Sequence, residues 1–393
     1  MAANTPLTIV WISDFPIEWL SELPTQLQKL ERRNPATWQM VLLTELEKNP
    51  ALRCHVILFR GQVAADISFR RHGVTFHLLK ASPKLRVASG FWLDTLRIRR
   101  LCAQIQPNVV HAWGSEKGAA LIASRLAYPY VMTIQGLFAW LKQKAKLSPY
   151  VRFIEGVERI SLQRAQVVTA ESHFAVQFLG THFPKPKVLQ VEHAPNPVFG
   201  RVCRRPSIQP IEFVSIGSLT RLKGTDLLFA ALDRLASEID FKLKIITDTS
   251  RQVIESYRPT VSERTWRRTE FKQHLLPHEV AAELETATVL LMPTRADNSP
   301  NAVKEAVVAG VPVVAAAVGG IPDYVIPGKN GELFPAGDLE AFGRALRAAC
   351  AHPRFCQGQV APETLAQMRA YLAPELMAQK FLAAYEAALA IGR

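Results

Sequence analysis

One loop in the second half of the chain carries residues whose types and spacing suit a phosphate with a sugar attached. The segment 293–306 follows an apolar strand pattern and leads into a helix pattern. Ser299 stands where a helix cap belongs, Pro300 suits the first helical position, and Gly310 suits the helix end. The free backbone amides around Ser299 to Asn301 would then face a negatively charged ligand.

Two carboxylates flank this helix start. Asp297 lies just before it, and Glu305 lies eight residues further along the chain. A carboxylate is a natural acceptor for the vicinal hydroxyls of a ribose or a hexose. We therefore expect the two side chains to hold sugar hydroxyls near the phosphate. The alternative is that Asp297 only complements the helix dipole.

A second loop, 215–226, also follows a strand pattern and precedes a helix. Gly217 permits close approach of a ligand to the backbone, and the amides that open the helix favour an anion. Arg221 and Lys223 add positive charge beside those amides. Together these groups suit a diphosphate. The alternative is an ordinary strand–helix turn with two solvated cations.

These motifs resemble the C-terminal domain of the retaining glycosyltransferases of the GT-B fold, specifically family 4. The family signature P-S-x-x-E-G-F-P-N-x-x-x-E-A corresponds to PTRADNSPNAVKEA, with Asp297 and Glu305 at its two acidic positions. The family motif G-R-L-x-x-x-K-G corresponds to residues 217–224. The resemblance is close over 211–340 and loose over the first half, and several motifs in the same order are specific. Further matches are Gly310–Val314, Gly319–Asp323 and Asn330-Gly331.

The resemblance implies a role for each matched residue. Lys223 would bind the donor diphosphate, Glu305 would hold the ribose hydroxyls, and Asp297 would contact the sugar or stabilise its reacting face. Amides near Ser299 to Asn301 would bracket the phosphates. Because helix dipoles and cations neutralise the leaving group, the resemblance implies neither a metal nor another cofactor.

Two positions depart from the family pattern. Ser218 occupies the place of the family's diphosphate-binding arginine, and Arg221 is the candidate replacement three residues further on. Asp297 is one methylene shorter than the usual glutamate, which shortens its reach toward the sugar.

The first half offers candidates for the acceptor side of the reaction. The strand ends V-H-x-H and T-x-H-G of the family correspond to residues 110–113 and 133–136 here. Only the first histidine is retained, as His111, which could also be an ordinary core histidine. The loop after the first strand contains a carboxylate that could orient an acceptor hydroxyl or simply cap a helix. The candidates on this side are Asp14, His111, Trp113, Glu116 and Gln135, with Glu171-Ser172 at another strand end.

The elements that must position these residues form two alternating series. Strand and helix patterns alternate through each half, which predicts parallel sheets covered on both faces. A proline-rich stretch separates the halves and indicates a linker. We expect an α/β protein with the GT-B architecture, in which two Rossmann-like domains face a central cleft. The predicted parts are an acceptor-binding domain 1–195, a linker 196–210, a donor-binding domain 211–373, and a helix 374–393 that returns to the first domain.

Positive charge is concentrated in the first half. Residues 1–200 hold 24 Lys and Arg against 13 Asp and Glu, a net charge of +11, whereas the remainder holds 23 against 21. This asymmetry predicts an anionic partner for the first domain, such as a membrane surface or a lipid-linked acceptor. No nucleic-acid-binding module is evident, so that partner is not expected. The basic clusters are 97–100, 142–146 and Arg70-Arg71. The apolar segment Leu137–Leu141 beside the second cluster suits a membrane interface, and the alternative is a solvated loop.

The sequence also indicates a compartment. Five scattered cysteines without metal-type spacing are typical of thiols in a reducing environment. No signal peptide and no apolar stretch long enough for a membrane span are visible. We therefore expect a cytoplasmic protein that associates peripherally with the inner membrane face.

The expected activity is transfer of a hexosyl group from a UDP- or GDP-sugar to a hydroxyl, with retention of the anomeric configuration. Cell-surface polysaccharide or lipopolysaccharide synthesis is the expected pathway. Two alternatives stay open: a sugar-nucleotide epimerase of the same fold, and a catalytically degenerate scaffold at the membrane.

Overall fold

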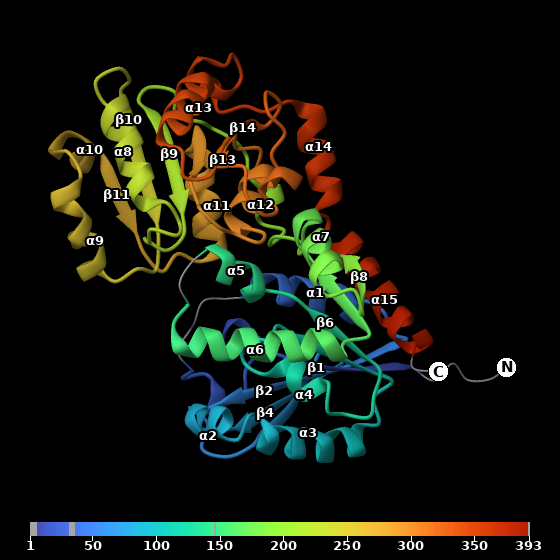
Figure 1. The fold of residues 1–393 in the computed structure, drawn as a ribbon. Coiled ribbons are helices and arrows are strands. Elements are labelled where there is room, and N and C mark those ends of the chain that lie inside the picture. Colours follow the sequence, from blue (N-terminus) through green and yellow to red (C-terminus); the bar gives the residue numbers. More distant parts are fainter. Residues whose placement is uncertain (1–5, 31–35, 145–146, 392–393) are drawn as a thin grey trace. The chain divides into compact units, whose positions relative to one another are not determined.

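The computed structural model describes residues 6–30, 36–144 and 147–391. The chain divides into two compact units (Figure 1). Unit 1 comprises Met1–His193 together with Pro374–Arg393, and unit 2 comprises Ala194–Ala373. The last helix of the chain is therefore part of unit 1.

Unit 1 is built on a sheet with the strand order β3-β4-β2-β1-β5-β6-β7-β8. Neighbouring strands are parallel except for the β3–β4 hairpin. The central strands are short apolar runs with both faces buried, as a sheet covered on both sides requires. The strands are β1 Leu7–Ile12, β2 Leu52–Arg60, β3 Ile67–Arg71, β4 Val74–Lys80, β5 Val109–Trp113, β6 Tyr130–Thr133, β7 Val167–Ala170 and β8 Lys187–Gln190.

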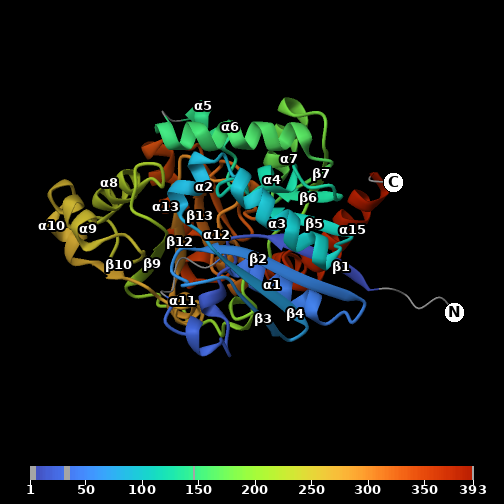
Figure 2. The ribbon, with the colours of Figure 1, turned by 90° about the horizontal axis from the view of Figure 1, so that it is seen from below.

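Helices cover both faces of this sheet. Helices α3, α4 and α6 share one face, and α1 packs against α15 on the other (Figures 1 and 2). Right-handed crossovers produce this division, because the chain moves along the sheet in opposite directions after β1 and after β5. The helices are α1 Thr37–Glu47, α2 Pro83–Ala88, α3 Trp92–Ile105, α4 Ala119–Ala123, α5 Phe138–Lys144, α6 Pro149–Arg164, α7 His173–His182 and α15 Pro374–Ile391.

Helix α15 enters the core of unit 1. Phe381 and Tyr385 are completely buried. The Tyr385 hydroxyl accepts a hydrogen bond of 3.1 Å from Nε1 of Trp11 on the first strand. The end of the chain thereby completes the hydrophobic core of its first unit.

Unit 2 contains a six-stranded parallel sheet with the order β11-β10-β9-β12-β13-β14. One apolar core lies under α8 and α13 and the other under α11, α12 and α14. The strands are β9 Ile211–Ile216, β10 Phe241–Ile246, β11 Thr269–Lys272, β12 Val289–Met292, β13 Val313–Ala316 and β14 Gly331–Phe334. The helices are α8 Thr225–Leu235, α9 Arg251–Tyr257, α10 Glu263–Arg267, α11 Pro277–Thr286, α12 Asn301–Ala309, α13 Leu339–Ala351 and α14 Pro362–Tyr371.

The segment expected as a linker, 196–210, packs onto unit 2. Phe199 is 2% exposed and lies in the core under α12. The Arg204 guanidinium donates to the carbonyl oxygens of Glu285 at 3.1 Å and Ala287 at 2.5 Å, at the carboxyl end of α11. A cation at that position satisfies carbonyls that have no partner within the helix. The prolines here mark an irregular segment with fixed contacts.

Among the described residues, none of the helices combines the length and the apolar content that a bilayer span requires.

Candidate active site

The predicted donor residues gather at one end of the unit 2 sheet. Strand β9 lies between β10 and β12, so the chain leaves β9 in one direction and β12 in the other. The carboxyl ends of these two strands form a topological switch point, where open α/β sheets place their ligands. The loops 217–224 and 293–300 both start there.

Close backbone contact holds these two loops together. Gly224 has a φ of 76°, and a side chain there would place its Cβ 1.9 Å from the carbonyl oxygen of Pro293. The backbone amide of Arg295 donates to the carbonyl oxygen of Leu222 at 2.8 Å. Glycine is therefore required at 224 for both its conformation and its size. Gly217, with a φ of 142°, is exposed and has open space around it.

An ion pair that sequence reasoning missed joins the same loops. Arg295 binds both carboxylate oxygens of Asp226, at 2.7 and 2.8 Å, and donates to the carbonyl oxygen of Arg221 at 2.5 Å. Burial raises the pKa of Asp226 and Arg295 lowers it, with a net downward shift. A bidentate pair fixes geometry as well as charge. The Arg221 side chain itself is exposed at this edge of the sheet.

Lys223 and Asp297 bind each other. The Lys223 Nζ atom lies 2.5 Å from Oδ2 of Asp297, whose side chain is only 12% exposed. A third loop contacts this pair, because a Cβ on Gly319 would lie 1.7 Å from the carbonyl oxygen of Asp297. A diphosphate that binds Lys223 must therefore share or displace Asp297. The structure brings these two predicted residues together.

Helix α12 starts one residue later than the cap prediction places it. Its first residue is Asn301 and its N-cap is Pro300, so the prediction that Ser299 caps the helix is wrong, and Pro300 lies one position earlier than expected. The Ser299 hydroxyl instead hydrogen-bonds the Tyr324 hydroxyl at 2.7 Å. The competing tyrosine comes from a distant part of the sequence. The amides of the first helical turn still point toward the switch point, as at any helix start.

Glu305 lies on α12, one turn from its start, and is partly buried. Burial raises the pKa of its carboxyl to about 7, and the neighbouring Lys304 opposes that shift. Lys304 is completely buried, which the sequence did not reveal. The Glu305 carboxyl therefore changes charge near neutral pH.

The acceptor-side candidate Asp14 is held by two cations at the carboxyl end of β1. Its carboxylate accepts from Nη1 of Arg60 at 2.6 Å and also pairs with Lys117. It does not cap a helix, because the following short 3-10 turn receives no side-chain cap. The pairing suits Asp14 to orient a ligand hydroxyl more than to remove a proton.

His111 lies in the core of unit 1, which favours the alternative of an ordinary core histidine over the candidate catalytic role. It is completely buried, and its ring nitrogens bond the Tyr385 hydroxyl at 2.8 Å and the Thr133 hydroxyl at 2.6 Å. Burial holds the pKa of His111 well below its usual range. Trp113 stacks on His111 at 4.3 Å. Its buried indole N–H has no hydrogen-bond partner among the residues that the structure describes.

The loops after β5 and β6 bring the two remaining candidates together. Glu116 accepts from the backbone amide of Gly136 at 2.7 Å. A Cβ on Gly114 would lie 2.1 Å from Oε2 of Glu116 and 3.0 Å from Oε1 of Gln135. Both side chains therefore lie against the backbone of Gly114. Burial raises the pKa of Glu116.

A second acid beside these loops was missed. Glu158, on α6, is completely buried and accepts from the amides of Ala139 at 2.8 Å and Phe138 at 3.2 Å. Burial, with a smaller contribution from the nearby Glu116, raises its pKa to about 8, and the hydrogen bonds from Ala139 and Phe138 oppose that shift. In the sequence, Glu158 lies within an ordinary amphipathic helix pattern, which gave no sign that its carboxyl would be buried.

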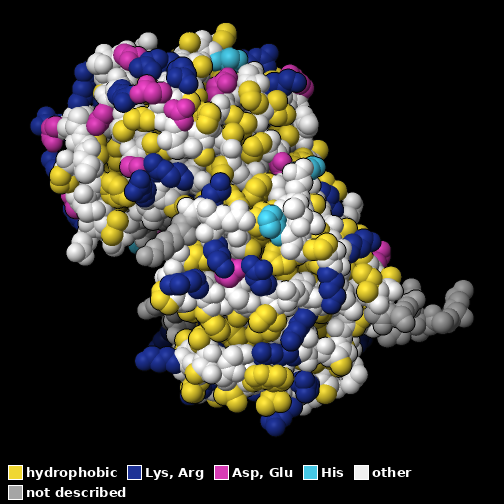
Figure 3. Space-filling model, viewed as in Figure 1, with side chains coloured by type: hydrophobic (Ala, Val, Ile, Leu, Met, Phe, Trp, Pro, Cys, Tyr) yellow, Lys and Arg dark blue, Asp and Glu magenta, His cyan; other side chains and the backbone are white. Residues whose placement is uncertain are grey.

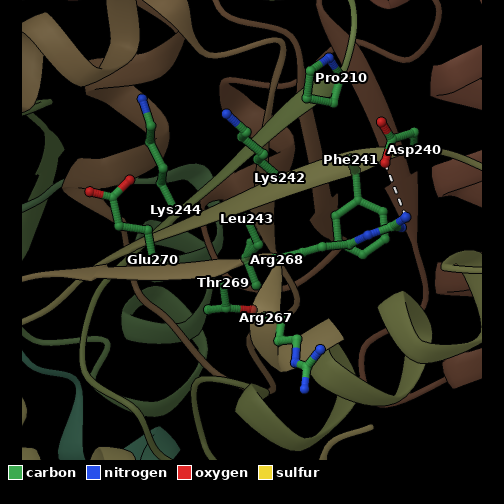
Figure 4. A pocket seen from close by; sticks show the side chains of 10 residues that line it. All are labelled: Pro210, Asp240, Phe241, Lys242, Leu243, Lys244, Arg267, Arg268, Thr269 and Glu270. Atoms are coloured by element: carbon green, nitrogen blue, oxygen red, sulfur yellow. Dashed lines mark ion pairs between the residues drawn. The ribbon is translucent and has the colours of Figure 1, made fainter. Parts of the chain in front are cut away.

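A separate hollow of 340 Å³ in unit 2 is lined by basic side chains (Figure 4). It lies where β10 and β11 begin, and Asp240 pairs with Arg268 at 3.0 Å within it. Ligands of parallel α/β sheets bind at the carboxyl ends of the strands. This hollow is therefore distinct from the candidate donor site.

Two family models match the chain. The one described as Glycosyltransferase Family 4 matches residues 42–198, and the one described as Glycosyl transferases group 1 matches residues 210–352. The second match contains both loops at the switch point, 217–224 and 293–300. Together the two matches cover most of the chain.

A curated relative and two solved structures illustrate the likeness. WcaL of Salmonella typhimurium, a glycosyltransferase assigned to colanic acid biosynthesis, is 33% identical over 149 residues, which are 35% of this chain and 35% of that protein. The chain thus aligns with about a third of the length of that relative. Sucrose-phosphate synthase of Thermosynechococcus elongatus has a TM-score of 0.78 at 16% identity, covering 97% of this chain and 98% of that one. HepE of Anabaena, solved with UDP and glucose, has a TM-score of 0.68 at 14% identity and covers 96% and 98%.

At these identities the structures show the fold alone. The expected class, an α/β chain with two Rossmann-like units of the GT-B type, is confirmed.

Proposed function

The chain belongs to the group 1 glycosyltransferases of the GT-B type, and from that premise we propose that it transfers a hexosyl group from UDP- or GDP-sugar to a hydroxyl with retention of configuration. The observation that carries this proposal is that Lys223 pairs with Asp297 at the switch point where α12, the helix that carries Glu305, also begins. Cation, carboxylate and helix amides are the groups that a nucleoside diphosphate needs.

The donor would bind with its diphosphate between Lys223 and the first turn of α12. Its ribose hydroxyls would donate to Glu305, and its sugar would lie toward Asp297. Arg221, exposed at the same loop, adds a second positive charge for the leaving diphosphate. We propose that these groups stabilise the leaving group without a metal or another cofactor, because fixed dipoles and cations are strongest where water is excluded.

Retention requires the acceptor to attack the face that the diphosphate leaves. In the proposed mechanism the departing phosphate oxygen takes the proton of the acceptor hydroxyl. This route needs no separate general base in the donor unit. It agrees with the pairing of Asp14 to two cations, which leaves that carboxylate suited to orientation.

The acceptor we propose is a saccharide or a lipid-linked saccharide of a cell-surface polysaccharide or lipopolysaccharide. The likeness to WcaL supports this pathway, since that protein is assigned to colanic acid biosynthesis. The net charge of +11 in residues 1–200 supports work on an anionic carrier at the cytoplasmic face of the inner membrane.

The slow reaction of donor with water tests this proposal without the natural acceptor. We expect UDP-glucose, UDP-galactose or GDP-mannose to yield nucleoside diphosphate and hexose in equal amounts, with a chelator present. Proton nuclear magnetic resonance should show the α anomer first, before mutarotation. Initial β anomer would contradict retention, and an epimerised sugar would favour the epimerase alternative. A protein that binds no donor and releases no diphosphate would support the scaffold alternative.

A further inference from the structure

Unit 1 exposes large apolar side chains on helices α2, α3 and α6. Soluble proteins expose such residues singly, and a continuous group marks an interaction surface. Seven of them lie on these three helices, with exposed fractions from 39% to 61%. They are Leu85, Trp92, Leu93, Leu96, Tyr150, Phe153 and Ile160.

These side chains form one surface. Phe91, at the start of α3, stacks on Phe153 of α6 with ring centroids 6.3 Å apart. Helices α3 and α6 both pack on α4, and α2 packs on α3. The two helices therefore lie on the same side of the sheet, as the ribbon views show (Figures 1 and 2). We call this surface the α2–α3–α6 face.

The exposed charges on these three helices are all positive. Their three acids, Asp94, Glu155 and Glu158, are at most 6% exposed. Among the charged side chains of unit 1 on the face drawn in Figure 3, dark blue is frequent and magenta is rare. The basic residues on the three helices are Lys84, Arg86, Arg97, Arg99, Arg100, Arg152, Arg159 and Arg164.

A groove of 380 Å³ combines both kinds of side chain on this face. Leu85, Leu93 and Leu96 provide its apolar lining, and Lys80 and Arg100 lie beside them. No ion pair is formed by Lys84 or Arg100 within the described ranges 6–30, 36–144 and 147–391. Both cations are therefore available to an external anion.

The structure also corrects the sequence-based view of this surface. The apolar segment Leu137–Leu141 was expected at the membrane, but Leu137 and Trp140 are at most 6% exposed, and Trp140 packs on Phe174. Lys146 lies outside the described residues. The exposed apolar residues are instead those of the α2–α3–α6 face.

We propose that the α2–α3–α6 face docks on an anionic lipid bilayer, with Leu85, Trp92 and Leu93 entering the interface and the surrounding cations binding lipid phosphates. Apolar residues ringed by Lys and Arg bind membranes by burial and by attraction to anionic lipids together. This inference deepens the membrane part of the proposed function. It explains how the enzyme would reach a lipid-linked acceptor.

Sedimentation of the full-length protein with vesicles tests the inference. The probes are vesicles of phosphatidylcholine alone and of phosphatidylcholine mixed with phosphatidylglycerol. We expect binding about tenfold or more tighter with phosphatidylglycerol, and weaker binding as salt is raised. Equal binding to both vesicles, or none to either, would overturn the proposal.

Two variants separate the contributions of charge and apolar surface. K84E/R100E should lose the preference for phosphatidylglycerol, whereas L85S/L93S should weaken binding to the anionic vesicles about tenfold or more. Matched controls in unit 2 are R344E and V253S, which change an exposed arginine and an exposed valine and should bind like the wild type. Wild-type binding by both unit 1 variants would contradict the assignment of this face.

Nucleotide binding is measured in the same samples to keep the two proposals separate. The unit 1 variants should bind UDP or GDP like the wild type, which also shows that they are folded. Loss of vesicle binding with normal nucleotide binding supports the docking face. Wild-type protein that binds vesicles but no nucleotide would leave docking intact and count against sugar transfer.

Discussion

Replacing Lys223 with alanine should weaken the binding of a nucleoside diphosphate by about 10- to 100-fold. A charge-assisted hydrogen bond to phosphate contributes about 1.5–3 kcal/mol when the site is partly shielded from water. Lys223 is 32% exposed and already bound to a carboxylate, so its ammonium is held at the switch point. Titration calorimetry with UDP and GDP measures the change.

The matched control is Lys242→Ala. Lys242 lines the hollow at the beginning of β10, in the same unit but at the opposite end of the strands. Its loss should leave nucleotide affinity unchanged. Asp297→Asn should distinguish the contribution of Lys223 from that of Asp297, because it removes the carboxylate that pairs with Lys223 and keeps the shape of the site. If Lys223→Ala and Lys242→Ala weaken binding equally, the diphosphate does not lie where we place it.

Replacing Glu305 with glutamine should lower kcat/KM by about 100-fold or more, with the protein still folded. The amide keeps the size of the side chain but has one accepting oxygen and turns an NH2 group toward the other ribose hydroxyl, and losing a hydrogen bond to a charged group carries effects of about this order. The loss of kcat/KM is measured from the steady-state release of diphosphate from the preferred donor. Glu332→Gln, at a partly exposed position on β14, is the matched control and should retain activity.

The pH dependence of binding provides a readout specific to this carboxyl. Burial raises the pKa of Glu305 from 4.5 to about 7, so the group becomes charged only as pH rises through neutrality. Affinity for the nucleotide should therefore rise between pH 6 and pH 8, by roughly the factor of ten that one ionisation allows, and then level off. The glutamine variant should show no such rise.

The same shift has a consequence for stability, with a defined sign. A carboxyl whose pKa is raised by folding stabilises the folded state fully below its unfolded pKa of 4.5, and that contribution is lost as pH rises through about 7. Glu305→Gln should thus raise the melting temperature of the empty protein at pH 8 more than at pH 5. If the melting temperatures of the variant and the wild type differ by the same amount at both pH values, this account of Glu305 is contradicted.

Much of unit 2 could be predicted because its signals are local. Strand β12 occupies the apolar run, and helix α12 begins one residue after the start that the proline indicated and ends at the glycine. Gly217 and Gly224 have positive φ values that few other residues adopt, so their positions marked the loop directly. The prediction that Ser299 caps α12 was wrong because the Ser299 hydroxyl bonds Tyr324 instead, and no local rule reveals that partner.

The contacts that define the site could not be predicted, because they join distant parts of the chain. Lys223 pairs with Asp297 across 74 positions, and Asp226 pairs with Arg295 across 69. His111 became a core residue because Tyr385, 274 positions away, supplies one of its partners. Sequence patterns identify which residues can do chemistry, whereas tertiary contacts decide which of them face a ligand.

The expectation that Leu137–Leu141 lies at a membrane interface was wrong for a different reason. An apolar run beside lysines has the same composition whether it lies in the core or on the surface. Trp140 is buried because Phe174 of α7 covers it, whereas Trp92 is 51% exposed. Only the packing of neighbouring helices distinguishes the two.

Hydrogen–deuterium exchange with saturating UDP or GDP, in the presence of a chelator, tests the central claim most directly. The claim is that the carboxyl ends of β9 and β12 hold the diphosphate, between Lys223 and the first turn of α12. It predicts slower exchange in peptides spanning 217–225 and 297–305, with the region around Lys242 and Arg268 unchanged. Protection confined to that second region, or nucleotide binding with no protection of either loop, would contradict it.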